Sequence, residues 1–341
     1  MAVWLVRAGR AGEREEFALE KGIAAIGWDE VPDMSTVPSR DALDAVLRET
    51  YPQASPQRLA NHLGQLWAFR ERIQEGDLVV LPLKHRAAIA IGRVTGPYSY
   101  RSDFPLGARH TRPVEWIRQD LPRSAFDQDL LHSLGAFLTV CRITRNNAEE
   151  RIPDILKGGR TAAPAMTAPS VKGEEPEESE APLDLEEYSR DQIRTFISRK
   201  FRGHDFARLV TAILDAQGYR TQTSPPGADG GVDIVAGHGP MGFDAPRLCV
   251  QVKSSDGPED VKTLRELQGV MKNFGAQQGL LVAWGGFKKT VHDEARRHFF
   301  EIRLWDAGDL VDALLKDYGS LPEDVQAELP LKRVWALVLE E

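Results

Sequence analysis

The sequence has only two cysteines, Cys141 and Cys249, each inside an apolar segment. Two isolated cysteines provide neither a disulfide framework nor a zinc site. No secretory leader follows Met1, so we expect a reducing compartment, the cytoplasm. Nothing in the 341 residues approaches the run of about 18 apolar residues that a membrane span needs. We therefore expect no membrane partner.

Basic residues are also in deficit, because 43 Lys and Arg face 51 Asp and Glu, for a net charge of −8. Such a balance argues at first against a nucleic-acid partner. The acidic excess is local, however: residues 146–188 hold 11 acids and 4 bases. The segments on either side are close to neutral. Since binding depends on local potential, either segment can still present a basic face to DNA.

The length predicts two domains separated by a linker. Residues 146–187 combine paired glycines, an Ala/Pro-rich run and consecutive glutamates, a composition that cannot offset the entropy of ordering the chain. This predicts a domain over 1–145, a flexible acidic linker over 146–187 and a second domain over 188–341.

The two domains show different patterns of apolar residues. In the first, short apolar strands at 3–6, 23–27, 78–83, 87–94 and 112–117 surround helices at 41–49 and 56–73, which predicts a small α+β barrel with helices. In the second, helices and strands alternate, which predicts an α/β fold with a mixed sheet flanked by helices. Its expected helices are 188–200, 205–216, 261–274, 290–299 and 307–316, and its expected strands are 219–223, 232–236, 248–253, 279–284 and 301–305.

Three polar residues on adjacent predicted strands carry the chemistry. In the strand 248–253 the apolar residues alternate with Cys249, Gln251 and Lys253, so the side chains of Gln251 and Lys253 project together. If 232–236 is the neighbouring strand, Asp233 reaches the same point. The alternative is a buried Asp that is satisfied by its own surroundings and a surface Lys on the next strand.

This set suits metal-assisted hydrolysis of a phosphodiester. Mg²⁺, or Mn²⁺ in its place, prefers oxygen ligands, which Asp233, Gln251 and the carbonyl of Val252 can supply. Lys253 can orient or deprotonate the attacking water and offset charge on the phosphate.

The same residues resemble the PD-(D/E)XK nuclease superfamily, and more narrowly the catalytic domain of Mrr-type restriction endonucleases. The resemblance covers residues 195–318 and rests on three ordered motifs: Gly203-His204-Asp205-Phe206, residues 227–233 ending in Gly231-Val232-Asp233, and Gln251-Val252-Lys253. It implies a metal-binding Asp233, a ligand-position Gln251 and a catalytic Lys253.

Two further acids are open to more than one interpretation. Asp205 matches the helix-borne acid of the family, although the family more often places Glu after the Phe. It is therefore either a catalytic acid or a helix N-terminal acid that interacts with the helix dipole. Asp229 is either a turn residue, which the pattern favours, or a second acid near the site.

The first domain resembles the EVE-like branch of the PUA superfamily over residues 1–145. The resemblance rests on Trp4, Ile26-Gly27-Trp28, the run from Gly76-Asp77 to Pro82, Ile91-Gly92-Arg93-Val94 and Arg112-Pro113-Val114-Glu115-Trp116. It implies an aromatic pocket for a modified base that is flipped out of the duplex, which needs stacking faces and a partner for the base edge. The aromatic candidates, for each of which core packing is the alternative, are Trp28, Tyr98, Tyr100 and Trp116; Asp77 or Ser99 would contact the base edge.

Together these features predict a modification-dependent restriction endonuclease that flips a modified base, for example a methylated cytosine, in double-stranded DNA and hydrolyses the backbone with Mg²⁺. A cut in both strands needs two active sites, so we expect a homodimer or a larger homo-oligomer. The alternatives are a nuclease of the same fold acting on unmodified or branched DNA, and a non-catalytic DNA-binding sensor.

Overall fold

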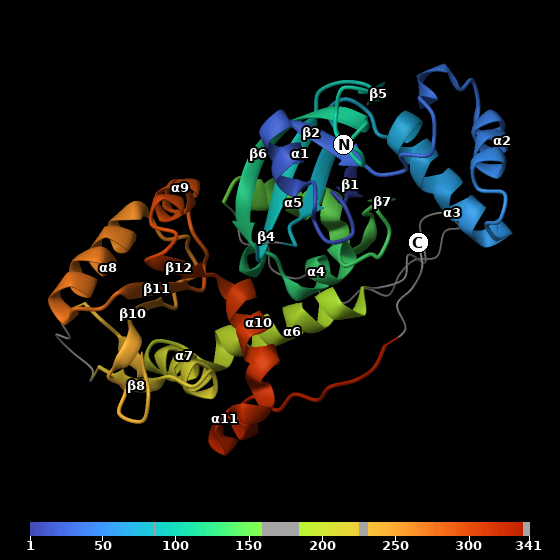
Figure 1. Ribbon diagram of the computed structural model, residues 1–341. Helices are drawn as coiled ribbons and strands as arrows, with labels where there is room; N and C mark the ends of the chain where they lie inside the picture. Colours follow the sequence, from blue (N-terminus) through green and yellow to red (C-terminus); the bar gives the residue numbers. More distant parts are fainter. Residues whose placement is uncertain (85, 159–183, 225–230, 337–341) are drawn as a thin grey trace. The chain divides into compact units, whose positions relative to one another are not determined.

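A computed structural model describes residues 1–84, 86–158, 184–224 and 231–336 (Figure 1). The chain forms two compact units, one built on Met1–Tyr188 and the other on Ser189–Trp335. Each unit contains one β-sheet. None of the helices in the described ranges combines the length and the apolar character that crossing a membrane requires.

The N-terminal unit is built on a seven-stranded sheet with the order β2-β6-β4-β3-β1-β7, in which β5 pairs with β6. β1 and β3 are parallel, and the remaining pairs are antiparallel. The strands are β1 (Val3–Val6), β2 (Ile23–Ile26), β3 (Leu78–Pro82), β4 (Ala88–Val94), β5 (Ser99–Tyr100), β6 (His110–Pro122) and β7 (Val140–Arg142).

Helices cover both faces of this sheet because the strands are apolar on both sides. Consecutive residues of β1, such as Trp4 and Leu5, belong to two different core clusters. One cluster includes Leu47 and Leu66 from two successive helices, and the other includes Leu130 from a helix that follows the long strand β6. The helices of the unit are α1 (Glu15–Lys21), α2 (Arg40–Thr50), α3 (Pro56–Trp67), α4 (Gln128–Leu134) and α5 (Ala148–Leu156).

The long strand β6 curls the sheet. It has 13 residues and pairs with both β2 and β4, with register shifts at two places along β4. Such bulges bend a strand and increase its twist. The predicted α+β architecture of the N-terminal domain, a barrel-like curled sheet with helices, is confirmed.

The predicted linker starts too early and ends too late. Within it, α5 is ordered, and its Ile152 and Ile155 are buried in the core of the N-terminal unit. At the other end, the amide of Asp184 donates a hydrogen bond of 2.8 Å to the carbonyl of Gly135, just after α4. Both flanks therefore belong to the N-terminal unit, whereas residues 159–183 lie outside the described residues. The boundary between the units falls inside one helix, α6 (Leu185–Lys200).

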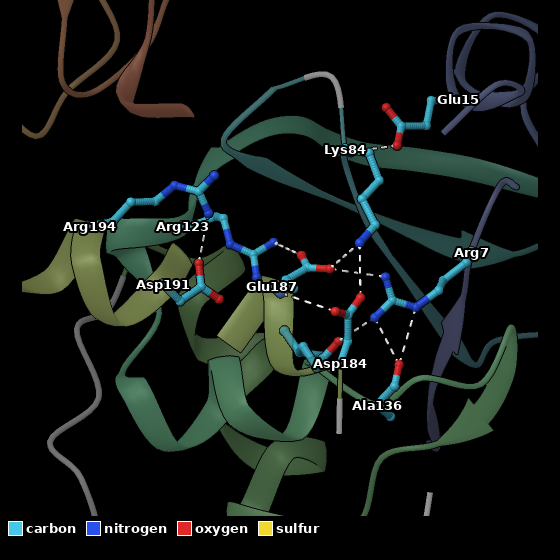
Figure 2. A network of polar contacts seen from close by, with 10 residues as sticks. Arg7, Glu15, Lys84, Arg123, Ala136, Asp184, Glu187, Asp191 and Arg194 are labelled. Atoms are coloured by element: carbon cyan, nitrogen blue, oxygen red, sulfur yellow. Dashed lines mark hydrogen bonds and ion pairs between the residues drawn. The ribbon is translucent and has the colours of Figure 1, made fainter. Parts of the chain in front are cut away.

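A buried cluster of charges holds the first turn of α6 in the N-terminal unit (Figure 2). The carboxylate of Glu187, with 6% of its side chain exposed, lies 2.7 Å from Lys84 and from Arg123, and 3.2 Å from Arg7. Lys84 also pairs with Asp184 at 3.1 Å. Burial alone would raise the pKa of Glu187, but the three cations outweigh it and hold that pKa far below the ordinary value of a carboxyl group.

The C-terminal unit is built on a five-stranded sheet with the order β12-β11-β10-β9-β8. β8, β9 and β10 are antiparallel neighbours, whereas β10, β11 and β12 are parallel. The strands are β8 (Arg220–Thr223), β9 (Ile234–His238), β10 (Asp244–Lys253), β11 (Gln278–Ala283) and β12 (Ile302–Trp305).

Helices flank this sheet as predicted, which confirms the mixed α/β fold of the C-terminal domain. On one face, Leu264, Leu267 and Val291 pack against Cys249 and Leu281 of the central strands. α7 and α10 pack against each other and against the sheet. The helices that follow α6 are α7 (His204–Ala216), α8 (Val261–Phe274), α9 (Lys289–Arg297), α10 (Ala307–Asp317) and α11 (Glu323–Glu328).

Candidate active site

The carboxyl end of β10 presents Gln251 and Lys253. The strand alternates as the sequence predicts, and Cys249 points into the core under α8. Gln251 is 5% exposed and Lys253 is half-buried. They are opposite Leu281 and Ala283 of β11 in a parallel register. Because side chains two apart in a strand share a face, Gln251 and Lys253 project on the same side of the sheet, roughly 7 Å apart.

Asp233 reaches β10 from the residue that precedes β9. Its Oδ2 accepts a 2.7 Å hydrogen bond from the amide of Val252, and its own amide donates to the carbonyl of Val250 at 3.0 Å. Val252 is the residue between Gln251 and Lys253. The structure thus places the carboxylate against the backbone of β10, at the residue between Gln251 and Lys253.

The oxygen atoms at this edge fit a hard divalent cation. Oε1 of Gln251 is buried and has no hydrogen-bond partner among the described residues. An unsatisfied buried acceptor costs about 1–3 kcal/mol, which a ligand at this position would recover. The N–H and C=O of one strand residue point the same way, so the carbonyl of Val252 faces the side of Asp233. Carboxylate, amide and carbonyl oxygens are the ligands that Mg²⁺ takes.

Further ligands would have to come from water or from the substrate. Within the residues that the structure describes, no group of three His, Cys, Asp or Glu side chains is placed to hold a metal ion. Mg²⁺ commonly keeps several waters and binds substrate phosphates through one or two carboxylates. The oxygen atoms of Asp233, Gln251 and Val252 at the carboxyl end of β10 would supply such a small number of protein ligands.

The start of α7 is attached to the same strand end. The amide of Gly203 donates a 3.2 Å hydrogen bond to Oγ of Ser254, and the amide of Trp284 donates to the carbonyl of Lys253 at 2.8 Å. Phe206 of α7 meets Trp284 edge to face, with ring centroids 5.6 Å apart. These contacts fix the backbone on which Lys253 is carried.

Asp205 is placed as a helix N-terminal acid. Its side chain is 61% exposed in the first turn of α7, and its carboxylate is 3.7 Å from Arg208 on the same helix. This position favours interaction with the helix dipole over catalysis. Asp229, together with the rest of 225–230, lies outside the described residues.

In the N-terminal unit, the rings of Tyr98 and Tyr100 and the backbone of Trp28 contact His110, a residue that sequence reasoning missed. The hydroxyl of Tyr98 is 2.7 Å from Nδ1 of His110, and Tyr100 meets the imidazole edge to face at 5.1 Å. Nε2 of His110 lies 3.2 Å from the carbonyl oxygen of Trp28. Burial raises the pKa of Tyr98, so its hydroxyl stays protonated. Ser99 is adjacent, and its hydroxyl is 3.0 Å from that of Thr111.

Two other candidates are used inside the fold. Asp77 is 8% exposed, and its carboxylate accepts hydrogen bonds from the indole of Trp4 and from the amides of Ala2 and Gln74. Trp116 donates from Nε1 to the carbonyl of Ala18 at 3.1 Å and packs against two core clusters. Packing and internal hydrogen bonds thus engage both side chains within the fold, and contact of Asp77 or Trp116 with a base stays a prediction.

Comparisons with known proteins identify the C-terminal domain. Residues 198–314 match the family model for the Mrr catalytic domain, described as a restriction endonuclease. The mixed sheet and the ordered motifs belong to that match, so the C-terminal domain of this chain belongs to the Mrr-type restriction endonucleases, a family of phosphodiester hydrolases. Residues 4–134 match a domain family of unknown function, DUF8426. No curated protein is significantly similar to the chain in sequence.

Several solved structures are distantly similar. The DNA modification-dependent restriction endonuclease AspBHI is 16% identical, with a TM-score of 0.34, over 91% of this chain and 87% of its own. The MspJI restriction endonuclease, solved in complex with a 27-mer oligonucleotide, is 16% identical, with a TM-score of 0.31, over 97% and 80%. A protein of unknown function, AF1548, is 17% identical, with a TM-score of 0.28, over 36% and 77%. These TM-scores are too low to establish a shared arrangement of the whole chain.

Proposed function

We propose that this chain is a Mg²⁺-dependent endonuclease that cleaves double-stranded DNA carrying a modified base. The observation that supports catalysis is the buried, unpartnered Oε1 of Gln251 beside the carboxylate of Asp233, on a strand that ends at Lys253. A satisfied structural Asp and a surface Lys would leave that oxygen unexplained.

Each residue at the edge of β10 has a distinct role in this proposal. Asp233, Gln251 and the carbonyl of Val252 hold the cation, with Mn²⁺ as a substitute for Mg²⁺. When bound, the cation offsets charge on the scissile phosphate and lowers the pKa of a bound water. Lys253 carries a positive charge beside the phosphate and orients the attacking water, for which it can also act as a base. A cut in both strands needs two such sites, so the active species is a homodimer or a larger homo-oligomer.

In this proposal the N-terminal domain recognises the modified base and so determines which DNA is cleaved. Tyr98 and Tyr100 offer stacking faces beside His110, and Ser99 offers a hydroxyl next to them. Trp28 is joined to the same His110 through its backbone carbonyl and keeps part of its side chain exposed. A flipped base is held by aromatic stacking and by hydrogen bonds to its edge. We take methylated cytosine as the modified base to be tested.

A comparison of two copies of one plasmid tests this proposal. With Mg²⁺, the purified chain is expected to cut the copy that carries 5-methylcytosine and to leave the unmodified copy intact, and a chelator is expected to abolish cutting. The measurement is the loss of supercoiled plasmid on a gel. Equal cutting of both copies would instead establish a nuclease for unmodified DNA. Binding of the methylated copy without cutting would establish a sensor.

A further inference from the structure

Trp28 has an unusual backbone conformation. Its φ is +115°, although it is not a glycine and carries a large side chain. Residues with a Cβ rarely adopt such angles, which persist only where the surroundings impose them and which occur often at ligand-binding positions. Trp28 lies between the end of β2 and the short 3-10 helix Met34–Thr36.

The imidazole of His110 holds this turn in place through hydrogen bonds. Nε2 lies 3.2 Å from the carbonyl oxygens of both Trp28 and Val31, and the amide of Val31 donates to the carbonyl of Trp28 at 2.9 Å. His110 has no exposed surface and is the first residue of β6, where it pairs with Ile26 of β2. A rigid strand therefore carries the group that fixes the strained turn.

The hydrogen-bond network determines which nitrogen of His110 carries the proton. Nε2 of His110 faces two carbonyl oxygens, which can only accept, so Nε2 carries the ring hydrogen. Nδ1 of the neutral ring is then the acceptor, and the hydroxyl of Tyr98, 2.7 Å away, donates to it while accepting from the amide of Met34 at 3.3 Å. Burial lowers the pKa of His110, which favours this neutral form.

The indole of Trp28 is part of a cluster of three ring side chains. Trp28 meets the ring of His62 edge to face at 5.6 Å, and His62 meets Tyr51 edge to face at 5.2 Å. Trp28 is only partly buried, whereas His62 is 4% exposed. The buried ring of His62 thus packs against an indole that keeps some surface in solvent.

We infer that His110 is a positioning residue for base recognition, because its Nε2 hydrogen holds the carbonyl of Trp28 and fixes the backbone that presents the indole to the modified base. This inference rests on the proposed function of the N-terminal domain. His110 itself does not touch the base. Its effect on discrimination passes through the orientation of Trp28.

The test measures binding of the full chain to two duplex oligonucleotides that differ by one 5-methylcytosine, with Ca²⁺ replacing Mg²⁺. His110→Leu removes the Nε2 donor and is expected to reduce the ratio of the two affinities about ten- to a hundredfold, as small misplacements of a positioned group do. His110→Gln keeps a donor at a similar distance along the side chain and is expected to restore most of the ratio. Affinity for the unmodified duplex is expected to stay within about twofold in both variants.

The outcomes separate two claims: that the chain recognises a modified base, and that His110 positions Trp28 for this recognition. If the wild-type chain does not prefer the methylated duplex, modification recognition itself is wrong, and this inference is wrong with it. If the wild type discriminates and His110→Leu does so equally, the inference alone is wrong. If His110→Leu fails to fold, His110→Asn serves instead: its shorter amide ends near the position of Nδ1 and does not reach the carbonyl of Trp28, and an unchanged affinity ratio would overturn the inference.

Discussion

Lys253→Ala is expected to slow DNA cleavage by about 10²–10⁴-fold, the range in which positioned acid–base groups contribute. Lys253 ends β10 next to the carboxylate of Asp233, and its carbonyl is fixed by the amide of Trp284. Removing the ammonium leaves the backbone contacts and the cation ligands in place. The loss is therefore expected in the rate of single-turnover cleavage, whereas DNA binding changes by only a few-fold.

A matched control separates this role from general charge effects. Lys316→Ala removes the same charge from an exposed position near the end of α10, and cleavage is expected to remain near the wild-type rate. Melting temperatures of both variants should stay close to that of the wild type, since neither lysine is fully buried. A Lys253→Ala protein that cleaves as fast as the Lys316→Ala control would remove Lys253 from the mechanism.

Glu187→Gln is expected to destabilise the N-terminal unit by about 3–5 kcal/mol, the usual cost of removing one partner from a buried ion pair. The substitution leaves Arg7, Lys84 and Arg123 together without the carboxylate that they share, although Lys84 keeps its pairing with Asp184 (Figure 2). Hydrogen exchange of the buried amides in β1 and β3 reports the unfolding free energy of this unit separately from that of the nuclease unit.

An exposed acid of the same unit provides the control, because Glu75→Gln removes the same charge and is expected to change stability by less than about 0.5 kcal/mol. The pH dependence gives a second check. The pKa of Glu187 is lowered in the folded state, so its stabilisation is present above the ordinary carboxyl pKa of 4.5 and is lost as the pH falls below it. The difference between wild type and Glu187→Gln should therefore shrink in acid. Equal stability at pH 7 would contradict a stabilising role of the cluster.

The nuclease fold was predictable because its helices α7 and α8 and its central strand β10 are long and strongly patterned. The alternation of apolar residues from Leu248 to Lys253 is enough to assign Gln251 and Lys253 to one face of the strand. The hydrogen bond from Val252 to Asp233 was not predictable, since it depends on where β9 leaves the edge of β10.

In the N-terminal domain, the sequence indicates which aromatic and polar residues are candidates for binding, but it does not indicate which contacts they make in the fold. Trp28 and Asp77 both follow glycines at strand boundaries, and the sequence gives no sign that the indole of Trp4 would bond to Asp77. His110 carried no signal, because its importance comes from the carbonyls of a turn about 80 residues earlier.

The linker illustrates a limit of reading composition. Acidic residues follow Asn147 and favour a solvated segment. Ile152 and Ile155, three residues apart, nevertheless form an apolar face that packs α5 into the core. The charges of Asp184 and Glu187 also pointed to a solvated segment. Cations from distant parts of the chain, Arg7, Lys84 and Arg123, bury Glu187 instead.

The most direct measurement is the position of a bound divalent cation in crystals of the full chain grown with Mn²⁺, located by anomalous diffraction. Our account predicts a peak at the edge of β10, in contact with the carboxylate of Asp233 and with Oε1 of Gln251, within reach of the carbonyl of Val252. A cation bound only elsewhere, with Oε1 of Gln251 accepting a hydrogen bond from the protein, would contradict it.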